Sequence, residues 1–289
     1  MEDLLYFCRF LHYAAVLQLF GIAVFQAAIA PPSLSRSLEA VLQRTAVVCA
    51  ATMLATALLW LALMAGSMGE GWPDFWNIGT IASVLTDTEF GHVWQVRLAL
   101  CLLLVVALFL RRRVWGLIVV LSALALGSLG FIGHAEMEEG LAAWLDQASQ
   151  FLHLISAGFW LGSLLPLLVC LRPHGNAADQ EAIATTLRRF SGYGHFAVAI
   201  ILATGVANAW FVLGTLHLDP AVPYQALLIA KLLLVGVLVG LALANRYIFM
   251  PWIGDGAGLR ALRVGTIAEM VVGAGVIGLV SVLGALSPT

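Results

Sequence analysis

The chain has 289 residues, of which 62% are hydrophobic and 10% charged, with a formal net charge of -2 and a mean hydropathy of +0.98. A soluble domain of this size carries roughly 25% charged residues, so the composition excludes an ordinary soluble protein and predicts a polytopic membrane protein. The charge balance gives no support to nucleic-acid binding. The four cysteines stand singly in apolar segments, which indicates core residues rather than a disulfide framework.

Apolar stretches that could cross a hydrocarbon layer of about 30 Å, each needing about 20 residues, recur along the chain. They predict an all-α fold, a single domain over residues 1–289 with a bundle of eight transmembrane helices. The predicted spans are 5–29, 43–66, 92–110, 114–133, 149–171, 193–215, 225–249 and 264–286. The first span lacks the basic leader of a signal peptide, so we expect it in the mature protein.

Basic residues predict the orientation of these spans. They gather in or beside the loops after the first, third, fifth and seventh spans: Arg36, Arg44, Arg111, Arg112, Arg113, Arg172, Arg188, Arg189, Arg246, Arg260 and Arg263. The positive-inside rule makes these loops cytoplasmic, so both termini are expected on the outer side of the membrane, which is the periplasmic side in a bacterial inner membrane. The opposite loops are acidic, which agrees with this orientation.

Sequence motifs of ATP-driven or hydrolytic enzymes do not occur. The chain has no Walker motif, no GxGxxG after a strand and no GxSxG. We therefore expect a membrane protein without enzyme activity.

Ionisable residues within or bordering the spans are the informative feature. Most are predicted to lie in the outer leaflet, drawn from five spans: Arg9, His12, His92, Arg97, His134, His153 and Lys231. Such groups are costly in hydrocarbon and usually mark a functional site. A histidine hydrogen-bonded to a neighbouring helix is the alternative, and it stays open for His153.

The segment around His153 carries two further signals. On a helix, His153 and Trp160 share one face, because residues seven apart are two turns apart. Gly158 and Gly162 form a GxxxG step, which predicts that a second helix approaches closely there.

Sulfur is expected at the same depth as the outer histidines. Met64 and Met68 end the second span, and Met137 follows His134 by three residues. Thioether and imidazole together suit a soft ion such as Cu(I). The alternative is that these methionines only fill space.

Two ionisable residues are predicted on the inner side, His195 in the sixth span and Glu269 in the eighth. Glycines flank both, Gly192 and Gly194 around the first and Gly265 and Gly273 around the second, so helices could approach closely there. An imidazole and a carboxylate could form an exit site or a proton-coupling pair. They could equally be structural hydrogen-bond partners.

The order of short motifs resembles the copper resistance protein D (CopD) family of bacterial inner-membrane proteins. The matching pieces are Arg9-Phe-Leu-His12 with Phe20-Gly21, Gly66-Ser-Met68-Gly69-Glu-Gly-Trp72, Phe90-Gly91 with Trp94, Gly133-His134-Ala135, Glu139-Gly140, His153 to Pro166, Arg189 to Phe196, Lys231, Ala244-Asn245-Arg246-Tyr247 and Glu269. The resemblance runs nearly end to end.

This resemblance implies a permease that moves copper from the periplasm toward the cytoplasm, with a separate periplasmic CopC-type protein as partner. It carries the candidate metal positions onto His12, Met68, His134, His153 and His195. No long outer segment rich in methionine or histidine is present, which leaves sensing or accessory roles open beside transport.

Positive side chains would surround such a copper site. Arg9, Arg97 and Lys231 are expected to orient polar groups or to limit cation leakage. The rival hypothesis is a b-type cytochrome, in which His12, His134, His153 and His195 would supply haem ligands. A purely structural membrane subunit is a third reading, which explains Lys231 and the clustered histidines poorly.

Overall fold

A computed structural model of the protein describes residues 1–110, 114–131, 140–172, 177–252 and 256–287. Within these ranges the regular elements are helices and no strand occurs, as the apolar pattern predicts. The elements are α1 Glu2–Val24, η1 Phe25–Ile29, α2 Pro32–Met68, α3 Trp72–Phe75, α4 Ile78–Asp87, α5 Glu89–Phe109, α6 Trp115–Gly127, η2 Ser128–Phe131, α7 Leu141–Cys170, α8 Ala177–Leu213, α9 Pro223–Ala244, η4 Asn245–Phe249, η5 Met250–Trp252 and α10 Gly256–Leu283.

Seven helices in the described ranges are long and apolar enough to cross a membrane. They correspond to seven of the predicted spans, and the chain is a polytopic membrane protein. The fourth predicted span corresponds to the shorter apolar segment Trp115–Phe131. The count of eight spans and the side on which the termini lie stay predictions.

Several helices begin earlier than the apolar pattern predicts. The helix α2 begins at Pro32 rather than 43, α7 at Leu141 rather than 149, and α8 at Ala177 rather than 193. Hydropathy reports where a chain enters hydrocarbon, whereas a helix continues as long as its backbone hydrogen bonds are made. These polar first turns therefore extend the helices beyond the apolar stretch.

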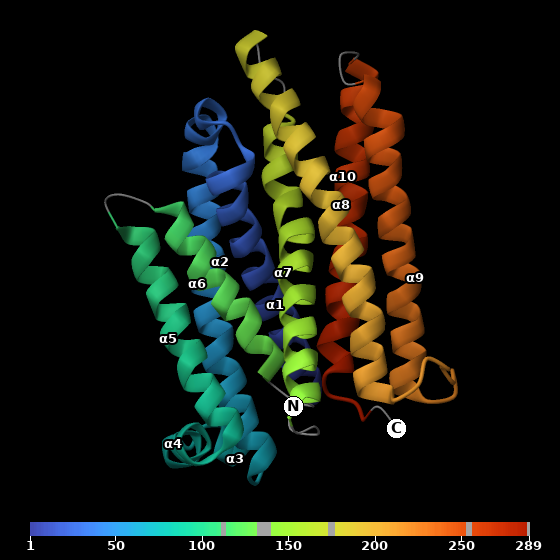
Figure 1. The fold of residues 1–289 in the computed structure, drawn as a ribbon. Helices are drawn as coiled ribbons and strands as arrows, with labels where there is room; N and C mark the ends of the chain where they lie inside the picture. Colours follow the sequence, from blue (N-terminus) through green and yellow to red (C-terminus); the bar gives the residue numbers. More distant parts are fainter. Residues whose placement is uncertain (111–113, 132–139, 173–176, 253–255, 288–289) are drawn as a thin grey trace.

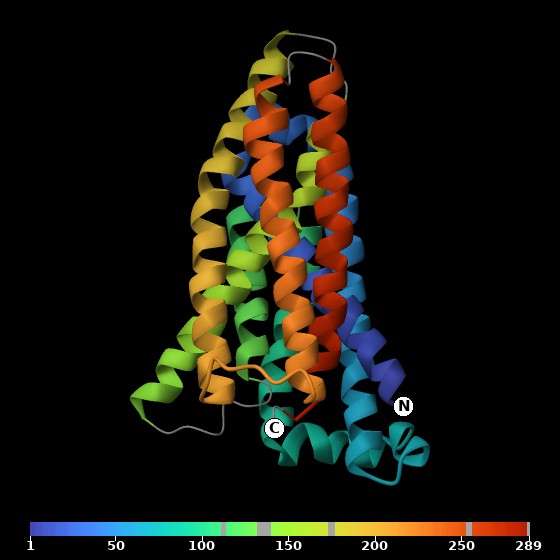
Figure 2. The same ribbon diagram turned by 90° about the vertical axis from the view of Figure 1, so that its right-hand side faces the viewer.

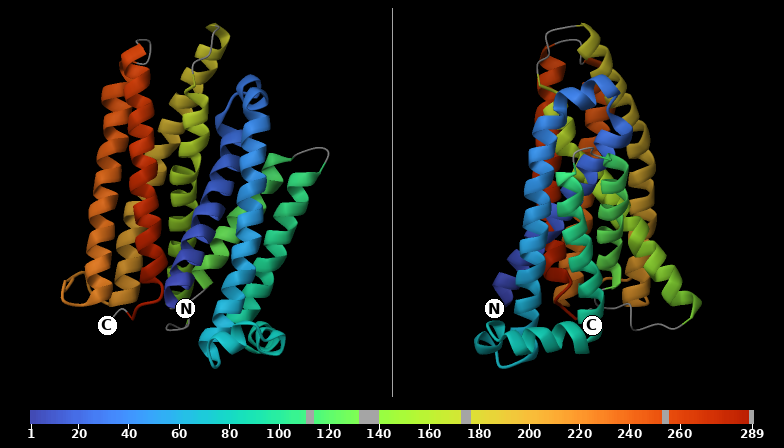
Figure 3. Two further views of the ribbon diagram at one scale, coloured as in Figure 1. Left: turned by 180° about the vertical axis from the view of Figure 1, so that it is seen from behind. Right: turned by 90° about the vertical axis from the view of Figure 1, so that its left-hand side faces the viewer.

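The long helices run side by side, with α1 and α7 at the centre of the bundle (Figure 1). The helices α2, α5 and α6 lie on one side of this central pair, and α8, α9 and α10 on the other. Both chain termini lie at one end of the bundle, where the short helices α3 and α4 also lie across its end (Figures 2 and 3). The arginine-rich helix ends lie at the opposite end.

Two glycines let the central helices touch through their backbones. A side-chain carbon at Gly21 of α1 would collide with the backbone of Gly162 on α7, and one at Gly162 would collide with the carbonyl of Leu17. The amide of Gln18 donates to the Gly162 carbonyl at 2.6 Å. The close approach predicted from the GxxxG step is confirmed, because helices lacking a Cβ at the crossing pack closely in membranes.

The side chain of Asp74 stabilises the loop between α2 and α5. Asp74 accepts hydrogen bonds from the backbone N–H of Glu70 at 2.6 Å and from the hydroxyl of Thr80 at 2.8 Å. Both bonds stabilise the charged carboxylate and lower the pKa of Asp74 below its ordinary value. An acidic, ordered surface therefore covers the end of the bundle that carries the termini.

The Gly162 contact gives the first prediction. The substitution Gly162→Ala forces α1 and α7 apart, and we expect the free energy of unfolding to fall by about 1–3 kcal/mol, the usual cost of overpacking. Titration of the detergent-solubilised protein with SDS, followed by circular dichroism, measures it. Gly236→Ala is the matched control, because Gly236 lies in open space on α9. Equal stability of the two variants would contradict the contact.

Candidate functional site

His12 is fully buried and both of its ring nitrogens are engaged. Its Nδ1 lies 2.8 Å from the hydroxyl of Thr56 on α2, and the hydroxyl of Thr56 donates to the carbonyl of Thr52 at 2.6 Å. The hydroxyl therefore accepts from Nδ1–H. The other nitrogen, Nε2, accepts from the Arg97 guanidinium, with Nε at 2.8 Å and Nη2 at 2.6 Å.

Arg97 is a fully buried cation whose other donors also have partners. Its Nη1 donates to the carbonyl of Ala125 at 2.9 Å and to the hydroxyl of Ser128 at 2.6 Å, and its guanidinium lies 5.6 Å from the ring centroid of Trp94. In the described part of the chain no carboxylate forms an ion pair with Arg97. The charge is held by neutral acceptors and an aromatic face, which makes removal of either partner costly.

Arg9 also lies near the end of the bundle that carries the termini. Its guanidinium lies 5.0 Å from the ring centroid of Trp60 and donates to the carbonyl of Gly284, just beyond α10, at 3.0 Å. This bond ties the end of α10 to α1. Arg9 therefore acts on packing in the described structure and does not contact His12.

His153 has a more open environment than His12. Its Nδ1 lies 2.9 Å from the hydroxyl of Thr204 on α8, and the hydroxyl of Thr204 donates to the carbonyl of Ile200 at 2.6 Å. Nδ1 is therefore the protonated nitrogen of the neutral ring and Nε2 carries the lone pair. The side chain is partly exposed, and the nearby charge of Lys231 on α9 acts on the ring.

A small polar network lies one turn before His153 on α7. The hydroxyl of Ser149 donates to Asn208 Oδ1 at 2.5 Å, and Asn208 Nδ2 donates to Gln150 Oε1 at 3.1 Å. This network joins α7 to α8 at the level of the histidine. Asn208 therefore forms hydrogen bonds between these two helices.

His12 and His153 both lie well inside their helices. His12 is ten residues beyond the start of α1, and His153 is twelve residues beyond the start of α7. At 1.5 Å per residue these are about 15 and 18 Å. The start of a helix does not fix where the chain enters hydrocarbon, so the depth of the two histidines in the membrane stays a prediction.

Met68, another predicted ligand, is not brought to these histidines. Met68 is 52% exposed and lies twelve residues beyond Thr56 on the continuous helix α2, which is about 18 Å along its axis. The structure therefore separates Met68 from His12. His134, together with Met137, lies outside the described residues.

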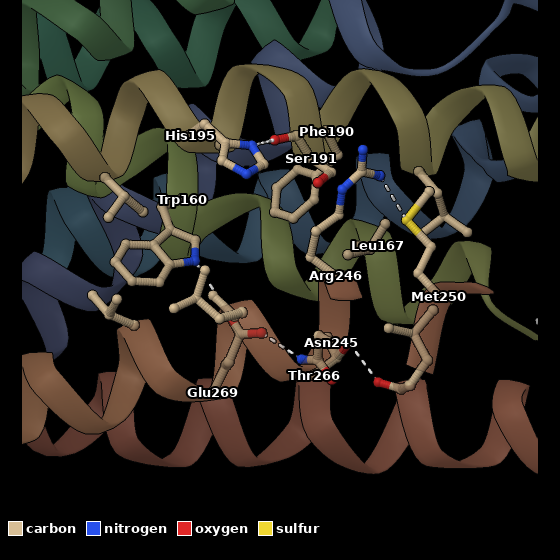
Figure 4. Close-up of a pocket in the computed structure, with 17 residues that line it drawn as sticks. Trp160, Leu167, Phe190, Ser191, His195, Asn245, Arg246, Met250, Thr266 and Glu269 are labelled. Carbon is tan, nitrogen blue, oxygen red and sulfur yellow. Dashed lines mark hydrogen bonds between the residues drawn. The ribbon is translucent and has the colours of Figure 1, made fainter. Parts of the chain in front are cut away.

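A cavity of about 150 Å³ lies toward the opposite end of the bundle, between α7, α8, α9 and α10 (Figure 4). Its lining includes His195, Arg246, Met250, Trp160 and Glu269. The cavity brings both predicted inner residues, His195 and Glu269, to one space. It also adds a thioether and a guanidinium to that space.

Glu269 is nearly buried, at 4% exposure, and both carboxylate oxygens have partners. Trp160 Nε1 donates to Oε2 at 3.1 Å, and Asn245 Nδ2 donates to Oε1 at 2.5 Å. Trp160 lies on α7 two turns beyond His153, so one face of α7 joins the histidine to this carboxylate. Glu269 thus makes hydrogen bonds to two neighbouring helices, and its part in an exit site or a proton-coupling pair stays a prediction.

His195 lies at the exposed rim of the cavity. Its Nδ1–H donates to the carbonyl of Ser191 at 2.6 Å, and the hydroxyl of Tyr247 lies 3.0 Å from Nε2. His195 and Glu269 share the cavity, and each is hydrogen-bonded to other residues. Gly192 and Gly194 face open space, so the close helix approach predicted there is wrong, whereas Gly265 and Gly273 do pack closely, against Asn245 and Leu161.

A π-helical turn at Asn245–Phe249 shapes this cavity and was not predicted. Single π-turns are frequent at functional sites because they change the direction of the side chains that follow. Here Asn245 contacts Glu269, Tyr247 contacts His195, and Arg246 Nη1 donates to Met250 Sδ at 3.0 Å. Hydropathy carries no signal for such a turn.

Within the described ranges no group of three or more His, Cys, Asp or Glu residues lies close enough to hold a metal ion. His12 and His153 sit in separate surroundings, and the cavity offers one imidazole, one thioether and one carboxylate along its walls.

Arg97 gives the second prediction. The substitution Arg97→Leu leaves His12 Nε2, the Ala125 carbonyl and Ser128 without their donor, so we expect the free energy of unfolding to fall by about 2–4 kcal/mol. SDS titration again measures it. Arg188→Leu is the control, because Arg188 is exposed and a surface substitution changes stability by about 0.5 kcal/mol or less. A similar loss in both variants would contradict the role of Arg97.

Comparison with known proteins identifies related sequences over almost the whole chain. Residues 1–144 match the family described as Copper resistance protein D-like, N-terminal domain, and residues 184–283 match the family described as Copper resistance protein D. No solved structure matches the chain.

Three curated proteins are similar to it. Inner membrane protein YebZ of Escherichia coli (strain K12) is 35% identical over 285 residues, 97% of each chain. Copper resistance protein D of Pseudomonas syringae pv. tomato is 32% identical over 306 aligned positions, covering 100% of this chain and 98% of that protein. Copper transport protein CutJ of Bacillus subtilis (strain 168) is 29% identical over 180 residues, 59% of this chain and 33% of that protein. The chain therefore belongs to the copper resistance protein D family and is a multi-pass inner-membrane protein.

Proposed function

We propose that this chain is a copper homeostasis protein that binds copper at the periplasmic face and moves it across the inner membrane toward the cytoplasm. The observation that carries the proposal is the end-to-end similarity to a protein named Copper resistance protein D. The similarity to a protein named Copper transport protein CutJ supports the same cargo. The proposed activity is transport rather than catalysis, in keeping with those names.

His153 is the residue best suited to receive the ion. Its ring is held by Thr204 through Nδ1 and is partly exposed, so Nε2 can act as a ligand without unfolding the site. An imidazole nitrogen is a borderline donor that binds copper well, and Cu(I) is the form that also suits the thioethers in this chain. His12 would first have to lose its bonds to Arg97.

A route from His153 to the inner end follows α7. Trp160 is two turns further along the same helix and donates to Glu269, which lines the cavity. Met250 and His195 line the same cavity and offer a sulfur and a nitrogen donor. In this proposal the ion passes from His153 to the cavity and leaves on the cytoplasmic side.

The positively charged side chains near the histidines would limit the passage of other cations through the membrane. Arg97 and Lys231 place positive charge in the same half of the bundle as the histidines, and a fixed charge there repels hydrated cations and protons. Arg9 fixes α10 to α1 and so preserves this arrangement.

The partner in this proposal is a separate periplasmic copper-binding protein of the CopC type. The ordered acidic loop folded by Asp74 lies at the end of the bundle that carries the termini. That surface is where the partner would deliver copper. None of the three relatives is named as a cytochrome, so the haem alternative has no support from the comparisons.

The third prediction tests copper binding directly. Cu(I) titration of the detergent-purified protein against a chromogenic competitor should show binding by the native chain. The substitution His153→Ala should weaken the affinity at least tenfold, because a ligand is lost. The absorption spectrum of the same samples should show no Soret band.

The control is His217→Ala, which removes an exposed histidine near the end of α8. It should leave the Cu(I) affinity within twofold of the native value. No Cu(I) binding by the native chain, or a Soret band that shifts on reduction, would refute the proposed function.

A further inference from the structure

Two stretches of this chain repeat one sequence pattern. Phe10-Leu11-His12 recurs as Phe151-Leu152-His153, and in both copies a glycine follows the histidine by nine residues, Gly21 and Gly162. The tripeptide Leu-Ala-Thr ends at Thr56 in α2 and again at Thr204 in α8. Short matches of this kind arise by chance, so their places in the structure decide whether they correspond.

The repeated residues make the same contacts in the two halves. In each half a histidine of the first helix bonds through Nδ1 to a threonine of the second helix, His12 to Thr56 and His153 to Thr204. Each threonine hydroxyl in turn donates to the carbonyl four residues earlier in its own helix, at 2.6 Å in both cases. The third long helix of each half then supplies a cation that acts on the histidine.

These third-helix cations are Arg97 and Lys231, each the ninth residue of its helix, α5 from Glu89 and α9 from Pro223. The helices that carry the corresponding residues run in the same order and in the same directions along the bundle (Figure 1). Thus α1, α2, α5 and α6 correspond to α7, α8, α9 and α10.

The two halves meet at their equivalent glycines. Gly21 and Gly162 contact each other, the Gly162 carbonyl accepts from Gln18, and the Gly21 carbonyl accepts from the Ser163 hydroxyl at 3.3 Å. A contact between equivalent positions is what a two-fold relation between repeats produces. Because α1 and α7 run in parallel, the axis lies along the bundle, as in transporters built from parallel repeats.

The halves differ in how tightly they close around the histidine. The helices α2 and α5 pack against each other, with 44% and 39% of their most apolar windows buried, whereas α8 and α9 hardly touch and have 17% and 6% buried. The inner cavity opens between α8 and α9. The second half therefore has the same order of helices as the first, with its second and third helices packed less closely.

The same difference appears at the ring itself. Arg97 covers Nε2 of the fully buried His12 with two donors. In the described ranges no hydrogen bond to Nε2 of His153 is found, and the ring is partly exposed. Gly205 leaves space beside the ring, since even a side-chain carbon there would stay 3.7 Å from His153 Cε1.

We propose that the chain is a tandem repeat of one four-helix unit in which the first histidine is locked by Arg97 and the second, His153, is the open copy that takes a soft metal ion through Nε2. Arginine holds a rigid fork that grips an acceptor, whereas lysine is a point charge on a flexible stem that can move aside. The exchange of arginine for lysine at the equivalent position thus distinguishes a structural site from a binding site. The assignment of a soft metal ion as the ligand of His153 rests on the proposed copper function. The difference between the bonded Nε2 of His12 and the Nε2 of His153, to which no described residue donates, does not depend on that function.

The fourth prediction places an arginine beside His153, in the position that Arg97 has beside His12. In the native detergent-solubilised protein, diethyl pyrocarbonate should modify His153 and leave His12 unmodified, as mapped by peptide mass spectrometry. The substitution Lys231→Arg keeps the charge and supplies the missing fork. It should lower His153 modification at least fivefold and weaken Cu(I) affinity at least tenfold.

Two matched variants complete the test. Lys231→Met removes the cation without supplying a fork and should leave His153 as reactive as in the native chain. Arg97→Lys should make His12 reactive toward the reagent while leaving His153 as reactive as in the native chain.

Equal reactivity of His12 and His153 in the native chain would overturn the inference without any variant. So would unchanged His153 reactivity in Lys231→Arg. Absence of Cu(I) binding by the native chain, with the reactivity pattern as expected, would refute the proposed function and leave the repeat standing.

Discussion

The backbone contact between Gly21 and Gly162 sets the distance between the two central helices, and the polar layers of the bundle depend on that distance. At this crossing the carbonyls of both glycines accept hydrogen bonds from the other helix. Any larger residue would separate α1 from α7. The two hydrogen bonds that cross between α1 and α7 would then be lost.

Burial of polar groups in a membrane explains why the two histidines differ. Hydrocarbon offers no hydrogen bonds, so a buried donor or acceptor must find a protein partner or border a space that water or an ion can enter. His12 and Arg97 bond to each other, and their remaining polar groups are paired with Thr56, Ala125 and Ser128, which links the four helices of the first half. Nδ1 of His153 is hydrogen-bonded to Thr204, whereas no hydrogen bond to Nε2 is found in the described ranges and the neighbouring helices α8 and α9 pack loosely. In the proposed function this Nε2 atom binds the ion.

Polar groups that line the cavity between α7, α8, α9 and α10 also have protein partners. Glu269 is held by Trp160 and Asn245, so its carboxylate is fixed at the wall, while His195 and Met250 lie on other walls of the same space. The π-turn after α9 brings Asn245 to Glu269 and Tyr247 to His195. Because Trp160 shares a face of α7 with His153, the outer and inner donors are connected by one rigid helix.

Hydropathy predicted the all-helical membrane fold and most of the spans, because a segment that crosses lipid needs a long apolar stretch, which can be read from the sequence. It placed the helix starts too late at α2, α7 and α8, because polar turns continue a helix beyond the membrane. The GxxxG step predicted the close crossing of α1 and α7, and the assignment of functional roles to the clustered histidines stays a prediction. The copper resistance family was likewise identified from short motifs, and the comparisons confirm it.

What the sequence left open depends on three-dimensional contacts. The pairing of Arg97 with His12 requires knowing which faces of α1 and α5 meet, and the distance of Met68 from His12 requires the register of α2 against α1. The π-turn has no hydropathy signal. The repeated Phe-Leu-His triplet was visible in the sequence, yet only the matching threonine contacts give it structural meaning.

X-ray absorption spectroscopy at the copper edge tests the central claim most directly, since it reports the atoms bound to the ion. The Cu(I)-loaded native protein should show imidazole scattering, and this scattering should be lost in His153→Ala and kept in His217→Ala. Sulfur scattering alone, or a spectrum that is the same in the native protein and in His153→Ala, would contradict the claim that His153 receives the ion.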